Sequence, residues 1–202
     1  MTPVTRVYLF RHGEVVLAET RRFIGHLDVP LSARGEAQCV AQSAHLREAP
    51  LAALYSSDLA RARRSGELLG EPRGLVPVEV PALREMAMGR WEGLTADEIR
   101  VREPDAFETW MASVGTFPFP EGESVPDLVD RAWPAFEALA TAHAGGAIAV
   151  VAHGGTNRAL LCRALGLPLE RLLAFGQGYA AMSVLEGSGR SWTLHRLNEE
   201  PS

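Results

Sequence analysis

The sequence predicts an α/β fold of three layers, in which a mainly parallel central sheet carries helices on both faces. Two nearly continuous apolar runs, at 7–10 and 147–152, are rich in branched residues, as expected of parallel strands covered on both faces. Strand-like and helix-like segments alternate between these runs, which is the pattern of an α/β protein. The 202 residues contain no internal repeat and no linker, so we expect a single domain over 1–202.

The first half of the chain contains two predicted helices and two further strands. A helix is expected over 33–48, because Ser32 is a suitable N-cap for its first turn. A short strand at 52–55 precedes a polar segment and a second helix, which continues to about Leu69. Another strand is expected at 76–80.

The third quarter of the chain is predicted to be helical. Residues 95–112 have a helical pattern that Pro104 interrupts. Ser124 is a suitable cap for a long helix that reaches about His143. We expect the region 95–123 to form a helical flap on the main body of the domain.

The last segments close the domain. A helix follows Gly155 and is expected to end near 166–168, where Gly-Leu-Pro is a usual stop signal. Two strands, at 180–186 and 191–196, are separated by Gly-Ser-Gly, which is typical of a hairpin.

Composition excludes several classes of partner. A net charge of −5 argues against a broad surface for nucleic acids or anionic membranes. No apolar stretch approaches the roughly 20 residues that cross a bilayer, and the run at 7–10 is too short for a signal peptide. Cys39 and Cys162 lie far apart and lack metal-binding spacing, which is typical of buried thiols in a reducing compartment. We therefore expect a cytoplasmic protein, with no nucleic-acid or membrane partner.

Polar clusters follow both apolar runs, Arg-His-Gly-Glu at 11–14 and His-Gly-Gly at 153–155. The carboxyl ends of parallel strands meet at one edge of a sheet, so His12 and His153 can converge there. Arginine offers donors that match a phosphate edge, and imidazole is a nucleophile near neutral pH. A glycine-rich helix start can direct backbone N–H groups at an anion. The two clusters therefore indicate a phosphate site.

A third element comes from the helix after the strand at 52–55. Arg61 is predicted in the first turn of that helix, where its side chain can extend over the strand ends. Arg63 and Arg64 fall on other faces of the same helix, so we expect both to be solvated.

These motifs, taken in order, resemble the histidine phosphatase superfamily, the phosphoglycerate-mutase-like enzymes. The resemblance covers most of the chain, at compatible spacing throughout. It rests on 11–14, on 25–32 with Gly35, on 56–63, on 83–85 before 89–93, on 120–124 and on 153–155.

The resemblance implies a role for each of five residues. His12 corresponds to the nucleophile that becomes a phosphohistidine. Arg11, Arg61 and His153 correspond to the rest of the phosphate pocket. Glu85 corresponds to the carboxyl group that protonates the leaving oxygen and later activates water. Lower-ranked candidates for that carboxyl group are Glu14, Glu92 and Glu123.

The resemblance also implies substrate contacts from Gly154, Ile24 and Gly25. The chain departs from the family pattern at Val15, Ala18 and Ile24, where many relatives carry polar side chains. The core chemistry is unaffected, but contacts that polar groups would make at these positions are in doubt.

The resemblance implies a phosphatase that needs no metal or other cofactor and acts on a small-molecule phosphomonoester, α-ribazole phosphate being one candidate. We expect a monomer or homodimer. The short route from Trp91 to Pro120 favours a phosphatase over a cofactor-dependent phosphoglycerate-type mutase, which usually carries an insertion there. A non-catalytic phosphate-binding or interaction protein is a further alternative. A zinc hydrolase is disfavoured, because the six histidines show no metal-ligand spacing. The aromatic residues of 107–119 either contact an apolar leaving group or pack the flap onto the body.

Overall fold

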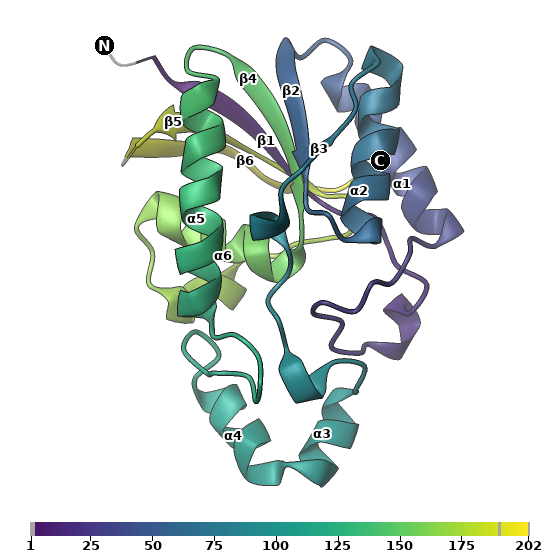
Figure 1. Ribbon diagram of the computed structural model, residues 1–202, viewed down its shortest axis with the longest axis vertical. Helices are drawn as coiled ribbons and strands as arrows, with labels where there is room; N and C mark the ends of the chain where they lie inside the picture. Colours follow the sequence, from purple (N-terminus) through teal and green to yellow (C-terminus); the bar gives the residue numbers. More distant parts are fainter. Residues whose placement is uncertain (1–2, 190, 202) are drawn as a thin grey trace.

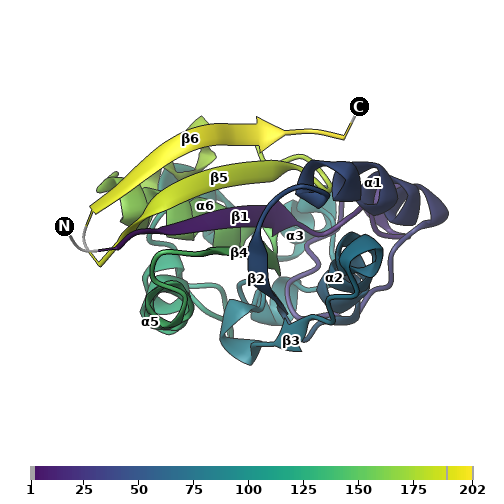
Figure 2. The same ribbon diagram turned by 90° about the horizontal axis from the view of Figure 1, so that it is seen from above.

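The computed structural model describes residues 3–189 and 191–201, whose strands form one mixed sheet (Figures 1 and 2). The strands are β1 (Thr5–Arg11), β2 (Leu51–Ser56), β3 (Val78–Glu79), β4 (Ala147–Ala152), β5 (Met182–Ser188) and β6 (Ser191–Glu199). They lie in the order β3-β2-β4-β1-β5-β6. The first four of these are parallel, β5 is antiparallel to β1, and β6 is antiparallel to β5. The predicted mainly parallel sheet and closing hairpin are confirmed.

Helices cover both faces of this sheet. They are α1 (Ala33–Ser43), α2 (Ala60–Gly70), α3 (Ala96–Arg102), α4 (Pro104–Ala112), α5 (Val125–Ala142) and α6 (Gly154–Leu165). Short 3₁₀ helices span Ala18–Thr20, Ala44–Leu46, Glu71–Arg73, Pro81–Leu83, Gly89–Trp91 and Leu169–Ala174. α1 and α2 pack together on one face and α5 and α6 on the other, whereas α3 and α4 lie at the end toward which the parallel strands run (Figures 1 and 2). The predicted three-layer α/β architecture is confirmed.

The core divides between the two faces of β4, whose residues are all buried. Successive side chains of a strand point to opposite faces. Ile148 and Val150 accordingly join the apolar cluster beneath α5 and α6, whereas Ala149 and Val151 join the cluster beneath α2. Burial of each such aliphatic side chain contributes roughly 1.5–3 kcal/mol, which fixes the position of β4 and of the residues that follow it.

Most predicted helix boundaries are confirmed by their caps. Ser32 Oγ accepts the Gly35 N–H at 3.0 Å, and Ser124 Oγ accepts the N–H of Asp127 at 3.3 Å. Pro104 is the first residue of α4, and Gly166 ends α6 in the left-handed conformation with φ 65°.

Several boundaries differ from the prediction, and the strands expected to end at 186 and 196 extend to Ser188 and Glu199. The helix expected over 33–48 ends at Ser43, and the 3₁₀ helix that follows it buries Leu46. The strand expected at 76–80 shrinks to β3, because Pro77 has no N–H to donate to a ladder. The strand expected from residue 180 begins at Met182, because Ala180 has a φ of 55°, which is incompatible with a strand.

The environment of the two cysteines agrees with the prediction of buried thiols. Cys39 and Cys162 are both buried free thiols. Within 3–189 and 191–201, no helix has the length and apolar character needed to cross a membrane.

Candidate active site

His12 and His153 lie side by side at the carboxyl ends of β1 and β4. The strand register pairs Arg11 with Ala152, and the His12 N–H donates to the Ala152 carbonyl oxygen at 3.0 Å. His153 follows Ala152 directly, and the two imidazole centroids are 5.1 Å apart. Both residues are buried, with exposed fractions of 5% and 0%. Parallel pairing thus brings together two histidines that are far apart in the sequence.

The imidazole of His12 is held in one tautomer. Its Nδ1 lies 2.7 Å from the carbonyl oxygen of Gly13, and a carbonyl oxygen can only accept a hydrogen bond. Nδ1 therefore carries the proton, and Nε2 carries the free electron pair. Burial, and then the charges of Arg11 and Arg61, hold the pKa of His12 well below its usual value. The ring is therefore neutral at pH 7, with an unprotonated nitrogen available as a nucleophile.

Arg11 is fixed beside His12 by two contacts from the segment before β5. Its Nη1 donates to the carbonyl oxygen of Gln177. Its Cζ lies 3.9 Å from the ring centroid of Tyr179, which is a cation–π contact. The Tyr179 ring also lies 5.8 Å from that of His12.

Arg61 is fixed by the loop between β1 and α1. It lies in the first turn of α2 and is 1% exposed. Its two terminal nitrogens donate to the carbonyl oxygens of Leu27 and Gly25, each at 2.7 Å. Arg63 and Arg64 are about half exposed, as predicted, and both pair with surface glutamates.

Buried polar atoms without a partner gather around His12. Among the residues that the structure describes, nothing bonds Arg11 Nε, Arg61 Nε or either ring nitrogen of His153. Burial, followed by the charge of Arg61, lowers the pKa of His153 well below its usual value, so this ring is neutral too. Most buried polar groups in proteins have hydrogen-bond partners. Unpaired donors beside two guanidinium groups form a site for an anion.

Glu85 binds the first turn of α6. Its carboxylate accepts the N–H groups of Gly155 at 2.9 Å and Thr156 at 3.0 Å, and the Thr156 hydroxyl at 3.3 Å. The acceptor at this helix start is therefore a carboxyl group of the protein, where the sequence alone suggested a ligand. Glu85 is thereby tied to the helix that begins after His153.

An arginine of α5 holds the loop that carries Glu85. Arg131 Nη1 donates to the carbonyl oxygens of Ala82 and Arg84 at 2.8 and 3.2 Å, and its Nη2 donates to that of Glu85 at 3.3 Å. The same guanidinium forms two hydrogen bonds with Glu123, both at 2.8 Å.

The three competing carboxylates are engaged elsewhere. Glu14 accepts from the Ser32 hydroxyl at 3.0 Å. Glu92 accepts two backbone N–H groups, and Glu123 pairs with the arginine of α5 described above. None of the three lines the pocket that contains His12, whereas Glu85 does.

This pocket has a volume of about 260 Å³. Among the predicted substrate contacts, Ile24 and Gly25 line it. Gly154 is buried as the first residue of α6, and a Cβ atom added there would lie 3.4 Å from Arg11 Nε. Val15 lines the pocket but Ala18 does not, so two of the three apolar departures, Val15 and Ile24, line it. The full lining is Arg11, His12, Val15, Arg21, Arg22, Phe23, Ile24, Gly25, Arg61, Glu85, Met88 and Tyr179.

Sequence reasoning missed Arg21, Arg22, Phe23 and Tyr179. Tyr179 precedes β5, which runs antiparallel to β1, so β5 begins at the edge where β1 ends. A correct assignment of that pairing would have placed the residues before β5 beside His12. The other three lie in an irregular segment, for which periodicity gives no signal.

The aromatic residues of the flap pack against one another. Trp91 is fully buried, with its ring 6.0 Å from that of Trp110 and 5.2 Å from that of Phe117. Trp110 also contacts Phe23, at 5.3 Å between ring centroids, and of these four only Phe23 lines the pocket. The contacts therefore favour the interpretation that these aromatics attach the flap to the body.

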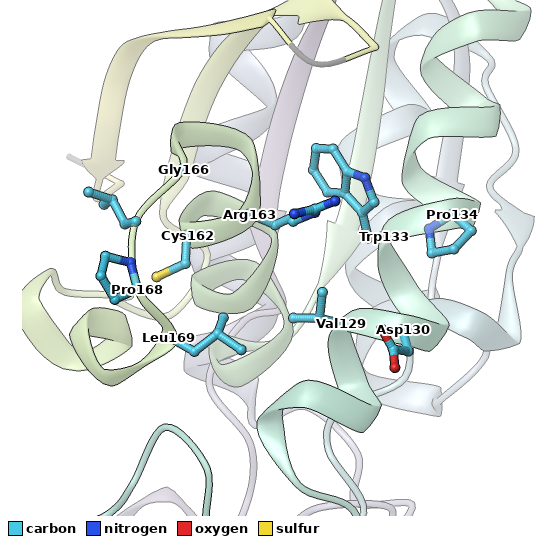
Figure 3. Close-up of a pocket in the computed structure, with 10 residues that line it drawn as sticks. Val129, Asp130, Trp133, Pro134, Cys162, Arg163, Gly166, Pro168 and Leu169 are labelled. Carbon is cyan, nitrogen blue, oxygen red and sulfur yellow. The ribbon is translucent and has the colours of Figure 1, made fainter.

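A larger hollow, of about 680 Å³, lies between α5 and α6 (Figure 3). Trp133 and Arg163 line it from the two helices, with Val129 and Leu169 at its lower part (Figure 3). It contains none of the predicted site residues.

Within the described part of the chain, no group of three or more histidine, cysteine, aspartate or glutamate side chains is arranged to hold a metal ion.

Comparisons with known proteins agree with this geometry. Residues 7–200 match the model of the histidine phosphatase superfamily, branch 1. The chain is 36% identical to a metal-independent phosphoserine phosphatase of Arabidopsis thaliana, over 79% of this chain and 68% of that protein. A mycobacterial glucosyl-3-phosphoglycerate phosphatase has a similar structure, with a TM-score of 0.88 and 32% identity over 98% of this chain and 100% of the other. The α-ribazole phosphatase of Shigella flexneri gives a TM-score of 0.87 and 26% identity over 96% of each chain.

The family model matches nearly the whole chain. Each of the two structural matches covers at least 96% of this chain and of the solved structure. The chain therefore belongs to the histidine phosphatase superfamily and is a phosphatase.

Proposed function

We propose that this phosphatase hydrolyses small phosphomonoesters through a phosphohistidine on His12, without a metal ion. One observation carries the proposal: a neutral, buried imidazole with an unprotonated Nε2 lines a pocket together with two guanidinium groups, and a second imidazole lies beside it. This is the combination that transfer of a phosphoryl group to a nitrogen nucleophile requires.

In the first step, His12 Nε2 attacks phosphorus as the bond from phosphorus to the ester oxygen breaks. Glu85, in its protonated form, gives its proton to that oxygen, and the alcohol leaves. The charge on the three equatorial oxygens is stabilised by Arg11, Arg61 and His153, whose fixed donors need no reorganisation.

In the second step, water attacks the phosphohistidine. The Glu85 carboxylate takes a proton from the water molecule as its oxygen bonds to phosphorus, and the bond from phosphorus to His12 Nε2 breaks. Inorganic phosphate leaves, and Glu85 is again protonated. Two displacements on one histidine replace a single direct attack of water on the ester.

The alternatives are a phosphoglycerate-type mutase and a non-catalytic phosphate-binding protein. Hydrolysis is favoured over the mutase because only the short helices α3 and α4 lie between Trp91 and Pro120. Catalysis is favoured over simple binding because Glu85 shares the pocket with His12. α-Ribazole phosphate is one candidate substrate, since a solved α-ribazole phosphatase is similar over most of its length.

The test compares EDTA-treated wild type, His12→Ala and His45→Ala on a chromogenic aryl phosphate. His45 is exposed and outside the pocket, so it controls for the loss of an imidazole. Hydrolysis that survives EDTA and His45→Ala but is lost in His12→Ala supports the proposal. Activity lost to EDTA and restored by metal, or activity retained by His12→Ala, overturns it.

A further inference from the structure

The segment 176–179 fixes Arg11, although it has no regular structure of its own. The carbonyl oxygen of Gln177 accepts from the Arg11 guanidinium, and the ring centroid of Tyr179 lies 3.9 Å from Arg11 Cζ. Glycine flanks Gln177 on both sides, and glycine allows the backbone more conformations than any other residue. A contact from outside the segment is therefore needed to hold it in one conformation.

That contact comes from Asn198, near the end of β6. Asn198 Oδ1 accepts the N–H of Gly178 at 2.6 Å, and Gly178 lies between the two residues that contact Arg11. Among the described residues, this is the one hydrogen bond that the backbone N–H groups of 176–179 donate. The side chain of Asn198 thus binds the segment at its midpoint.

The backbone around Asn198 is itself anchored. Its φ is 54°, in the left-handed region, which asparagine adopts more readily than most residues. Its N–H donates to Ser183 Oγ of β5 at 3.1 Å. The carbonyl oxygen of the next residue, Glu199, accepts from the buried side chain of Gln42 in α1 at 2.8 Å. The Asn198 side chain therefore starts from a fixed point when it reaches the segment.

A local role at the end of the strand does not account for the Asn198 side chain. Glycine would adopt the same φ without steric cost. The bonds to Ser183 and Gln42 use only backbone groups of β6. Of these bonds, only that to Gly178 requires an acceptor on the side chain of Asn198.

We propose that Asn198 is a positioning residue of the phosphate pocket, which acts through Gly178 on Arg11. Without its side chain, the segment 176–179 can move, and the guanidinium group loses its fixed direction toward the phosphoryl oxygens. Donors that are fixed in advance stabilise a transition state better than donors that must reorganise. The inference rests on the proposed function, because Arg11 is proposed there to stabilise the transferred group.

The test measures kcat/KM for an aryl phosphate and inhibition by inorganic phosphate. Asn198→Gly keeps the left-handed backbone and removes the acceptor, whereas Asn198→Asp keeps an acceptor at the same position. Glu121→Gly is the matched control, because Glu121 also has a positive φ, of 60°, and is exposed outside the pocket. Arg11→Ala and the double variant Arg11→Ala/Asn198→Gly show whether the effect passes through Arg11.

Asn198→Gly should lower kcat/KM and weaken inhibition by phosphate about 5- to 10-fold each, as expected for the loss of one hydrogen bond. Asn198→Asp should recover most of both losses. Glu121→Gly should stay within about 2-fold of wild type, and adding Asn198→Gly to Arg11→Ala should change kcat/KM less than about 2-fold. If Asn198→Gly does not fold, Asn198→Ser, whose side chain is one bond shorter, takes its place.

Three results would each overturn the positioning role and leave the proposed function standing. They are an unchanged kcat/KM without the Asn198 side chain, no recovery in Asn198→Asp, and an equal loss in the presence and absence of Arg11. Hydrolysis that His12→Ala retains would overturn the proposed function, and this inference with it.

Discussion

The carboxylate of Glu85 accepts the backbone N–H of Thr156 at 3.0 Å, three residues after His153. The proposed proton donor and the imidazole proposed to bind phosphate are therefore fixed to the same helix start. This helix follows β4, whose register with β1 places His12 beside them. One strand pair and one helix thus hold His12, His153 and Glu85, while α2 contributes Arg61. Substitutions in this frame should act on catalysis without removing a proposed reacting group.

Gly155→Ala should reduce catalysis with little effect on folding. The added Cβ would lie 2.5 Å from Glu85 Oε1, so the carboxylate must move. Alanine is favoured over glycine inside a helix by about 1 kcal/mol, which offsets local strain. We expect kcat to fall at least about 10-fold, since a displaced proton donor loses much of the roughly 10²–10⁴-fold contribution of such groups. Steady-state kinetics and urea unfolding check this. An unchanged kcat would show that the position of Glu85 is not critical.

Arg131→Ala should loosen the loop that carries Glu85. Arg131 donates to three carbonyl groups of that loop and to Glu123, so its loss takes one hydrogen-bond partner from each of these acceptors. Thr156, His26 and Ala87 remain as partners of the Arg84 carbonyl group, the Glu85 carbonyl group and the Glu123 carboxylate. Each such loss costs roughly 1–3 kcal/mol, so unfolding in urea should show a decrease of at least that size. We also expect kcat to fall more than the affinity for inorganic phosphate, because the arginines of the pocket are untouched. A fall in affinity alone would contradict this positioning role.

Ser65→Ala should weaken the connection between the two sides of the phosphate pocket. Ser65 Oγ accepts the Gly13 N–H at 3.0 Å and donates to the Arg61 carbonyl oxygen at 2.7 Å. The substitution leaves the buried Gly13 N–H unpaired, at a cost of about 1–3 kcal/mol. Inorganic phosphate should inhibit the variant less strongly, whereas Ser43→Ala, remote from the pocket, should not change inhibition. Equal inhibition of both variants would remove this role for Ser65.

Acid should destabilise the protein through His12 and His153. Burial lowers the pKa of both rings, together with the charges of Arg11 and Arg61, and unfolding returns each to about 6.5. Below pH 6.5 the unfolded state binds protons that the folded state does not. The free energy of unfolding therefore falls as the pH drops toward the lowered pKa values of the two rings in the folded state. Well above pH 6.5 the effect vanishes.

The measurement is urea unfolding at pH 7.5 and 5.5. The free energy of unfolding of the wild type should be lower at pH 5.5 than at pH 7.5. Replacement of either histidine by asparagine should make this difference smaller by up to about 1.4 kcal/mol. The same loss in the variants and the wild type would show that the buried rings do not titrate in this way.

The sequence predicted the strands with continuous apolar patterns and the helices with clear caps. β4, α5 and α6 lie within about two residues of their expected positions, because burial on both faces and Ser124 or Gly166 leave a direct signal. β3 was predicted too long, since periodicity does not show that only two residues pair.

The proposed site residues His12 and His153 were accessible to sequence reasoning because they directly follow strands with continuous apolar patterns. Tyr179 and Arg21 were not, because their positions depend on the antiparallel pairing of β5 and on a loop with a left-handed residue. Likewise, the binding of Glu85 to the start of α6 depends on a contact across 70 positions, which no local pattern encodes.

The stereochemical course at phosphorus tests the phosphohistidine most directly. A phosphorothioate monoester made chiral with oxygen isotopes is hydrolysed in isotopically labelled water, and the configuration of the product is determined. Two in-line displacements, first by His12 and then by water, predict net retention of configuration. Inversion would mean that water attacks the ester directly, and it would contradict the account.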